Sequence, residues 1–148
     1  MNNPELRYQA LLTTLHERGS RLTSHRLALI RLLSTSEGHP NAMQLYESLR
    51  LQFPTISLAT IYKTLALLKD EGEVLEIDLH NDSHYDGNKP YPHPHLICTQ
   101  CHKIFDGDEI TAIQKINQEI EDRYNFQISR HQLVFYGMCW ECREKTDR

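Results

Sequence analysis

The stretch that decides the fold is SLATIYKTLALLKDEGEVLEIDL, residues 57–79. Ser57 is a good N-cap, and the apolar residues that recur at helical spacing after it are Leu58, Ile61, Leu65 and Leu68. Gly72 stands where glycine commonly ends a helix, so the pattern predicts a helix over 58–69. Beyond it, apolar and acidic residues alternate through residues 75–79, as in a half-buried strand. A helix followed directly by a short β-ribbon predicts a winged helix.

The polar face of this predicted helix is small and cationic. At about 100° per residue, Ala59, Thr60 and Lys63 fall opposite the apolar stripe, with Tyr62 at its edge. Small residues allow a helix to lie close to a DNA groove, and Thr, Tyr and Lys reach phosphates and base edges. A solvated helix face is the alternative reading. Seven cations and two anions lie between residues 18 and 69, which favours a DNA-binding half despite the net charge of −4.

Three short helices are predicted before this one. The first runs from Glu5 to Glu17 and ends at Gly19, and the second begins after an N-cap at Thr23. Asn41 with Gln44 resembles a capping box for the third. In the second helix, Leu22, Leu27, Ile30 and Leu33 are expected to form the buried stripe. The first helix carries Leu6, Leu11, Leu12 and Leu15 at mainly helical spacing, and the third carries Met43, Leu45, Tyr46 and Leu49.

The second half of the chain has a different pattern. The polar stretch His80–Pro94 is predicted to form the wing tip and an interdomain linker. Residues 96–98 and 103–105 flank a Cys-x-x-Cys turn and predict a hairpin, and Asp108–Asp122 predicts a helix with Ile110, Ile113, Ile116 and Ile120 on one stripe. Further strands are expected at 126–128 and 133–136. A small sheet with one isoleucine-faced helix gives a hydrophobic core that is marginal for a lone domain, and pairing with a second subunit in a dimer would enlarge that core.

All four cysteines lie in two Cys-x-x-Cys pairs, Cys98/Cys101 and Cys139/Cys142. Tetrahedral zinc prefers thiolates, and two such pairs supply four ligands with no position left for a substrate, so a structural zinc site is predicted. Two disulfides are the alternative expected in an oxidising compartment, and a thioredoxin-like redox pair would need only one motif beside a βαβ pattern.

A second group of candidate ligands surrounds the first cysteine pair. It comprises Asp86, His93, His95 and Asp106. Imidazoles and carboxylates suit a divalent metal such as iron(II), manganese(II) or zinc. His93 and His95 are two residues apart, so in a strand they project to the same side and can reach one ion.

Several function classes are disfavoured by the sequence. No apolar run approaches the length of a membrane span, and no secretory signal is visible at the start, so a cytoplasmic protein is expected. A zinc deaminase would need a His-x-Glu motif, and four thiolates leave zinc without a catalytic water, so an enzyme is not expected. A zinc-ribbon adaptor would explain the cysteines but not the cationic face at Thr60–Lys63.

Taken together, several stretches resemble the ferric-uptake-regulator (Fur) family of metal-dependent repressors, and the match covers nearly the whole chain. They are Glu37–Ala42, the helix Ser57–Leu65, Tyr85–Asn88, the run from His93 to Asp106, and the run from His131 to Cys142. The resemblance implies an α+β fold with a winged helix-turn-helix DNA-binding domain at 1–85, a hinge at 86–94, and a small α/β dimerisation domain at 95–148. It implies a homodimer on a palindromic double-stranded DNA operator, away from membranes.

The resemblance also assigns residues to sites. Cys98, Cys101, Cys139 and Cys142 match the family's structural zinc ligands, one zinc per subunit. His39, Asp86, His93, His95 and Asp106 match the regulatory site, which would hold iron(II) or manganese(II) and bind from both sides of the hinge. The expected DNA contacts are Tyr62, Lys63, Thr60, Ala59 and Arg21.

Three departures from the family pattern are informative. Pro92 and Pro94 replace ligands of a third metal site, so that site is expected to be missing although His131 is retained. His102 replaces the usual glycine after the second cysteine. Asp86 and Asp106 stand where iron-uptake regulators more often have glutamate, which favours the peroxide-responsive PerR-type branch, whose members are released from DNA when iron oxidises a ligating histidine, here His39 or His93. An iron- or zinc-uptake regulator is the alternative.

Overall fold

The computed structural model describes residues 3–79 and 81–146, and these form two compact units that divide between Pro90 and Tyr91. Both units combine helices with a sheet, so the mixed α+β class is confirmed. No helix within the described part of the chain is both long and apolar enough to cross a bilayer.

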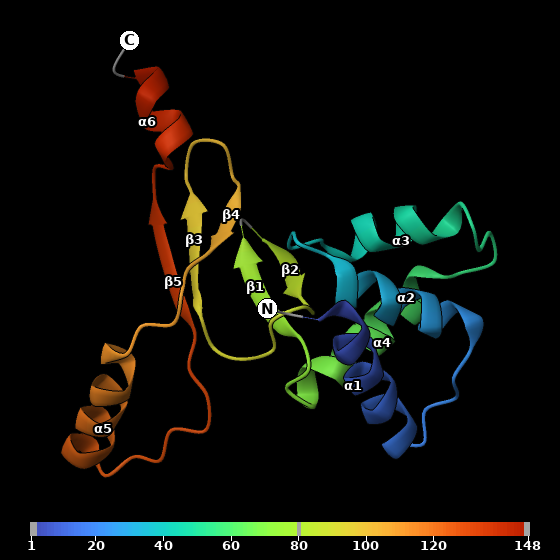
Figure 1. The fold of residues 1–148 in the computed structure, drawn as a ribbon, viewed down its shortest axis with the longest axis horizontal. Helices are drawn as coiled ribbons and strands as arrows, with labels where there is room; N and C mark the ends of the chain where they lie inside the picture. The colour runs from blue at the N-terminus through green and yellow to red at the C-terminus, as the bar shows by residue number, and fades with distance from the viewer. Residues whose placement is uncertain (1–2, 80, 147–148) are drawn as a thin grey trace. The chain divides into compact units, whose positions relative to one another are not determined.

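Four helices build most of the first unit (Figure 1). They are α1 (Pro4–Glu17), α2 (Ser24–Thr35), α3 (Ala42–Arg50) and α4 (Leu58–Asp70). The predicted caps are confirmed: the side chains of Thr23 and Ser57 accept from the backbone N–H groups of Arg26 and Thr60, and Asn41 with Gln44 forms the capping box. Local sequence therefore determines where these helices begin.

Gly72 ends α4 with a positive φ of 72°. Its N–H donates to the carbonyl of Lys69, and the N–H of Glu73 donates to the carbonyl of Leu68, at 2.9 and 2.8 Å. This pair of bonds is a Schellman motif, in which a left-handed residue lets the chain turn back over the helix end. The turn directs the chain from α4 into the wing.

One hydrophobic cluster joins the four helices of this unit. Its buried members are Leu11, Leu15, Leu29, Ile30, Leu33, Ala42, Leu45, Leu49, Ile56, Ile61, Leu65, Leu68, Val74 and Tyr85. Leu22, which was expected in the buried stripe of the second helix, is instead exposed, and Leu6 and Met43 are exposed as well. Leu6 and Met43 lie in the first turns of α1 and α3, and Leu22 lies in the loop before α2.

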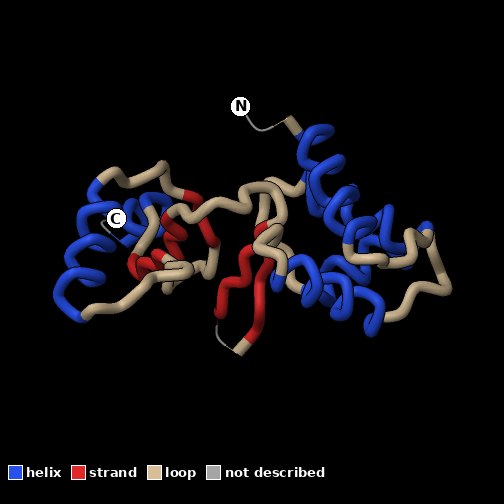
Figure 2. Tube along the Cα trace, turned by 90° about the horizontal axis from the view of Figure 1, so that it is seen from below, coloured by secondary structure: helices blue, strands red, loops and turns tan. Residues whose placement is uncertain are grey.

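The wing is the antiparallel hairpin of β1 (Leu75–Leu79) and β2 (Asp82–Asp86), which pair from Leu75 with Asp86 to Leu79 with Asp82. Figure 2 shows the two strands side by side next to the helices of the same unit. The sequence assigned β2 to a polar wing tip and linker, because it is rich in Asp, Ser and His. Cross-strand hydrogen bonds and burial of Tyr85 make it a strand nonetheless. His80, where the predicted wing tip begins, lies outside the described residues.

The second unit contains a three-stranded sheet in the order β4-β3-β5. β3 (Pro94–Cys98) and β4 (Ile104–Asp106) form the predicted antiparallel hairpin, and β5 (Leu133–Gly137) runs parallel to β3. The helix α5 (Ala112–Tyr124) begins later than predicted, and residues 107–110 are not helical. Thr111, at its N-cap position, makes no side-chain cap hydrogen bond. The strand expected at 126–128 is wrong, since these residues form a loop, and α6 (Trp140–Thr146) was not predicted.

The apolar residues of this unit are largely exposed. No residue of α5 is buried, and Ile116 on the predicted isoleucine stripe is 50% exposed. Other exposed apolar or aromatic side chains are Leu96, Ile110, Ile120, Phe126, Phe135, Tyr136, Met138 and Trp140. Ile113, Ile116 and Ile120 lie on α5 as the periodicity indicates, whereas Ile110 precedes the helix. Nothing within the described part of residues 91–146 buries this stripe.

Candidate metal centres and DNA-facing helix

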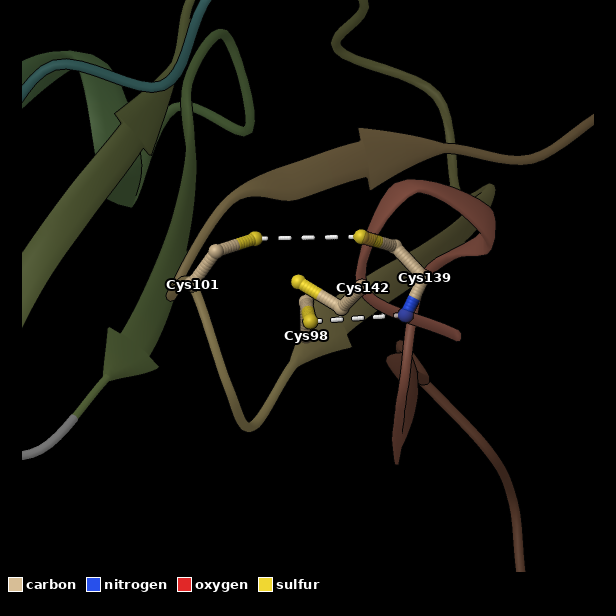
Figure 3. A group of neighbouring side chains, drawn as sticks. All are labelled: Cys98, Cys101, Cys139 and Cys142. Carbon is tan, nitrogen blue, oxygen red and sulfur yellow. Dashed lines mark hydrogen bonds between the residues drawn. The ribbon is translucent and has the colours of Figure 1, made fainter. Parts of the chain in front are cut away.

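The two Cys-x-x-Cys pairs meet in the second unit (Figure 3). Cys98 ends β3, Cys101 lies in the turn before β4, Cys139 follows β5, and Cys142 lies in α6. Their four Sγ atoms all lie within 4.8 Å of one another. The Sγ atoms of Cys101 and Cys139 are 3.8 Å apart, and the backbone N–H of Cys139 donates to the Sγ of Cys98 at 3.3 Å.

This geometry fits a tetrahedral metal ion. Four thiolates at about 2.3 Å from one zinc ion stand about 3.8 Å from one another, which is the separation between Cys101 and Cys139. All four cysteines are free, so the disulfide alternative has no support in the structure. With four sulfur ligands the coordination is complete, which is the pattern of a structural site.

The pKa values of the Cys98 and Cys142 thiols are shifted in opposite directions. The backbone N–H groups of Cys139 and Cys101 lower the pKa of Cys98 to about 6, because they stabilise its thiolate. Burial raises the pKa of Cys142 to about 12, because the thiolate is poorly solvated there. A divalent cation at the centre of the four sulfurs supplies the charge that would hold all of them as thiolates.

His102 keeps the turn after the second cysteine in spite of its side chain. Its φ is 60°, in the left-handed region that favours glycine, and its N–H donates to the carbonyl of Cys98 at 2.9 Å. His102 therefore adopts the backbone conformation that glycine favours at such a turn.

In the first unit, His39 and Asp86 lie side by side, with His39 Nε2 3.6 Å from Asp86 Oδ2. Strand β2 brings them together. The N–H of Tyr85 donates to the carbonyl of Pro40 at 3.0 Å, and Nδ1 of His84 lies 2.6 Å from the carbonyl oxygen of His39. The segment before α3 is thus bound to the last residues of β2, and Asp86 is the end of a strand.

The carboxylate of Asp86 is also oriented by the turn that follows it. Its Oδ1 accepts from the backbone N–H groups of Asn88 and Lys89, each at 3.0 Å. The other oxygen, Oδ2, is the one that lies toward His39. One oxygen is therefore occupied by the backbone while the second faces the imidazole.

In the second unit, His93, His95 and Asp106 form another group. Strands β3 and β4 pair His95 with Asp106, and the rings of His93 and His95 are 4.3 Å apart between centroids, so they do project to one side. Oδ1 of Asp106 is 3.2 Å from Nε2 of His93 and 3.8 Å from Nε2 of His95. Convergence of imidazole nitrogens on carboxylate oxygens within each unit is the donor chemistry of a divalent metal site.

The predicted DNA-facing residues lie on the surface of α4 as expected. Tyr62 is 50% exposed, Ala59 and Lys63 are exposed, and Thr60 is half-buried. The hydroxyl of Thr60 is 2.9 Å from that of Ser57, so Thr60 helps to order the first turn of the helix. Arg21 is exposed in the loop before α2.

Two residues that contact the backbone at His39 and beside Asp86 were not predicted from the sequence. His84, on β2, contacts the backbone carbonyl of His39 through its Nδ1. Arg7, on α1, is buried and donates to the carbonyl of Gly87, directly after Asp86. Neither has a periodic signal, since each contact joins residues far apart in the chain.

The winged helix of the first unit, the four-cysteine cluster and the His/Asp groups define the class of the protein: a metal-binding, winged-helix regulatory protein. Residues 17–136 match the model of the ferric uptake regulator family. Over 136 residues the chain is 36% identical to the peroxide-responsive repressor PerR of Staphylococcus aureus, covering 90% of each chain.

Two solved structures are also similar. The ferric uptake regulator of Vibrio cholerae is 29% identical with a TM-score of 0.68, over 86% of this chain and 98% of that one. The PerR of Streptococcus pyogenes, solved for its peroxide sensing and gene regulation, is 32% identical with a TM-score of 0.50, over 91% and 92%. This chain belongs to the ferric uptake regulator family, whose members are metal-responsive transcriptional repressors and not enzymes.

Proposed function

We propose that this protein is a peroxide-responsive, metal-dependent repressor that binds a palindromic DNA operator as a homodimer. The observation that carries the proposal is the pairing of imidazole with aspartate in both units, His39 with Asp86 and His93 with Asp106. It is supported by the 36% identity to peroxide-responsive PerR proteins. In this proposal residues 1–85 bind DNA, 86–94 are the hinge, and 95–148 dimerise in the cytoplasm.

The four cysteines would hold one structural zinc ion in each subunit. The 3.8 Å sulfur separation and the closed set of thiolates support zinc at this position. With its coordination complete, this ion would stabilise the second unit and take no part in sensing.

The regulatory metal would be iron(II) or manganese(II), held by His39, Asp86, His93, His95 and Asp106. The first unit supplies two of these ligands and the second supplies three, and neither group alone completes the coordination of such an ion. A metal ion ligated from both units binds tightly only to the arrangement in which the two groups meet. It therefore shifts the population toward that arrangement, in which the dimer would present both winged helices to DNA.

For peroxide sensing, an iron(II) ion held by these residues would supply the chemistry that cleaves the O–O bond of hydrogen peroxide. One peroxide oxygen would enter a C–H bond of the His39 or His93 imidazole, which is thereby oxidised by two electrons, and the other oxygen would leave as water. An oxidised imidazole is a poorer ligand, so the metal-bound arrangement would be lost and DNA released. Aspartates are short carboxylates, and their use at both positions favours a site that leaves iron open to peroxide.

Operator binding is assigned to the exposed face of α4, through Tyr62, Lys63, Thr60 and Ala59, together with Arg21. Each of the cations can neutralise a phosphate, and the affinity should fall with log salt with a slope of about −0.9 per phosphate contact. A dimer would bury the exposed apolar residues of α5 and β5, which a lone second unit leaves in solvent.

An iron- or zinc-uptake regulator is the second candidate, because the chain is also 29% identical to the ferric uptake regulator of Vibrio cholerae. Such a regulator releases DNA when the metal dissociates, and no residue is modified. Iron-loaded protein should therefore be treated with peroxide and analysed by mass spectrometry. A gain of one oxygen on the peptide with His39 or His93 supports peroxide sensing, and its absence from both favours the uptake regulator.

Two variants test the site assignments directly. Replacing Tyr62 and Lys63 with Ala should abolish operator binding while the dimer and its zinc persist; loss of the dimer would instead show that α4 has a structural role. His39→Ala should keep zinc and folding but remove metal-dependent DNA binding. Unchanged metal activation in this variant would contradict the hinge mechanism.

A further inference from the structure

A buried arginine on α1 reaches the turn that follows the ligand Asp86. Arg7 is only 9% exposed. Its Nε donates to the carbonyl of Gly87 at 2.6 Å, its Nη1 donates to Oε2 of Glu73 at 2.5 Å, and its Nη2 donates to the carbonyl of Glu73. All three nitrogens of the guanidinium are therefore engaged, as a buried charge requires.

Glu73 connects this arginine to the end of α4. Its carboxylate also accepts from the hydroxyl of Thr14 at 3.0 Å, so α1 holds it through two side chains. Its backbone N–H donates to Leu68 in the Schellman motif that ends α4. A shift of Arg7 would therefore displace Glu73 and the last turn of α4, the helix proposed to contact DNA.

The Asp86 turn, residues 86–89, is confined by the same contacts. A Cβ atom at Gly87 would lie 2.8 Å from Cβ of Leu33, so the turn lies directly on α2. On its other side the Gly87 carbonyl receives the Arg7 hydrogen bond, and within the turn Asn88 and Lys89 donate to Asp86. The direction of the Asp86 carboxylate thus depends on where Arg7 and Leu33 hold Gly87.

We propose that Arg7 is a positioning residue for the regulatory metal: it orients Asp86 through Gly87 and joins that ligand, through Glu73, to the C-terminal end of α4. The inference rests on the proposed function, since it takes Asp86 as a metal ligand and α4 as the DNA-facing helix. It adds a hydrogen-bonded connection between the two within one unit, with Arg7 at its centre.

Arg7→Met removes the donors and keeps most of the apolar stem. In zinc-loaded, full-length protein it should weaken manganese(II) binding about 10-fold or more, as for other residues that orient a metal ligand. In the manganese-free protein, Arg7→Met should increase the rate of backbone amide hydrogen exchange at Asn88 and Lys89. The matched control is Arg31→Met, because Arg31 pairs with Glu5 at 2.5 Å between α2 and α1 but is exposed and does not contact the Asp86 turn. The control should change neither quantity more than about twofold.

A double variant, Arg7→Met with Glu73→Leu, separates positioning from stability. Replacing both partners of a buried ion pair with apolar residues leaves no uncompensated charge, so thermal stability should recover. The Gly87 carbonyl still lacks its donor, so manganese(II) affinity should stay low. Recovery of wild-type affinity in the double variant, or unchanged affinity in Arg7→Met, overturns the proposal.

The wild-type protein and His39→Ala distinguish failure of this inference from failure of the proposed function. If His39→Ala binds manganese(II) as tightly as wild type, the ligand set itself is wrong and both proposals fall. If His39→Ala loses affinity while Arg7→Met does not, only the role given to Arg7 is wrong.

Discussion

Loss of a single cysteine should unfold the second unit and leave the first intact. Among its described residues the second unit buries few apolar side chains, namely Pro94, Ile97, Cys98 and Cys142, whereas the first unit has a continuous cluster of aliphatic residues. Full burial of one isoleucine contributes about 1.5–3 kcal/mol. A structural zinc ion contributes an apparent free energy of about 10–16 kcal/mol near pH 7. The metal is therefore expected to dominate the stability of this unit.

Cys142→Ser removes one thiolate, and the prediction is checked by peptide-level hydrogen exchange together with zinc content. Zinc should be lost, and amides of β3 and β5 should exchange at rates near those of unfolded chain, while α2 and α4 keep their protection. Trp140→Phe is the control, since Trp140 lies between Cys139 and Cys142 but supplies no ligand. Native protection of β3 and β5 in zinc-free Cys142→Ser would refute the reasoning, because apolar burial would then suffice.

Three further predictions address individual residues. Ser57→Ala removes the N-cap of α4 at a cost of about 1 kcal/mol and should weaken operator binding, measured by fluorescence anisotropy, about fivefold; Asn3→Ala removes the cap of α1 at similar cost and should not. Burial raises the pKa of the Tyr85 phenol to about 12, so the folded state holds this proton more tightly than the unfolded state does. The associated stability is present below pH 10 and lost between pH 10 and 12, a loss that denaturant titrations should find smaller in Tyr85→Phe. His102→Gly should keep stability within about 1 kcal/mol, because relief of the left-handed φ offsets the entropy of glycine, whereas His102→Val should destabilise by more than about 1 kcal/mol.

Features governed by neighbouring residues were predictable from the sequence. The caps at Thr23, Asn41 and Ser57 and the stop at Gly72 each depend on hydrogen bonds within about five residues, so short motifs report them. The Cys-x-x-Cys pairs are similar, because each pair presents its sulfurs from a single local turn.

Strand pairing and the burial of a side chain by a distant element could not be predicted from the sequence. The sequence of β2 resembles a loop because it is polar and only Tyr85 and Asp86 are buried. Its assignment as a strand depends on its pairing with β1, which the tertiary structure shows. Leu6 and Met43 have helical spacing yet remain exposed, since periodicity gives the face of a helix but not whether another element covers it. The isoleucine stripe of α5 is the same case on a larger scale.

By itself the sequence determined the winged-helix order of elements, the two Cys-x-x-Cys pairs and the chemistry of the His/Asp groups, because these follow from local spacing and residue type. Only the tertiary structure decided that the last residues of β2 bind the segment before α3 and so bring His39 to Asp86, and that Arg7 holds the turn beyond it. The physical reason is that hydrogen bonds between residues 45 or 80 positions apart leave no periodic trace in the chain.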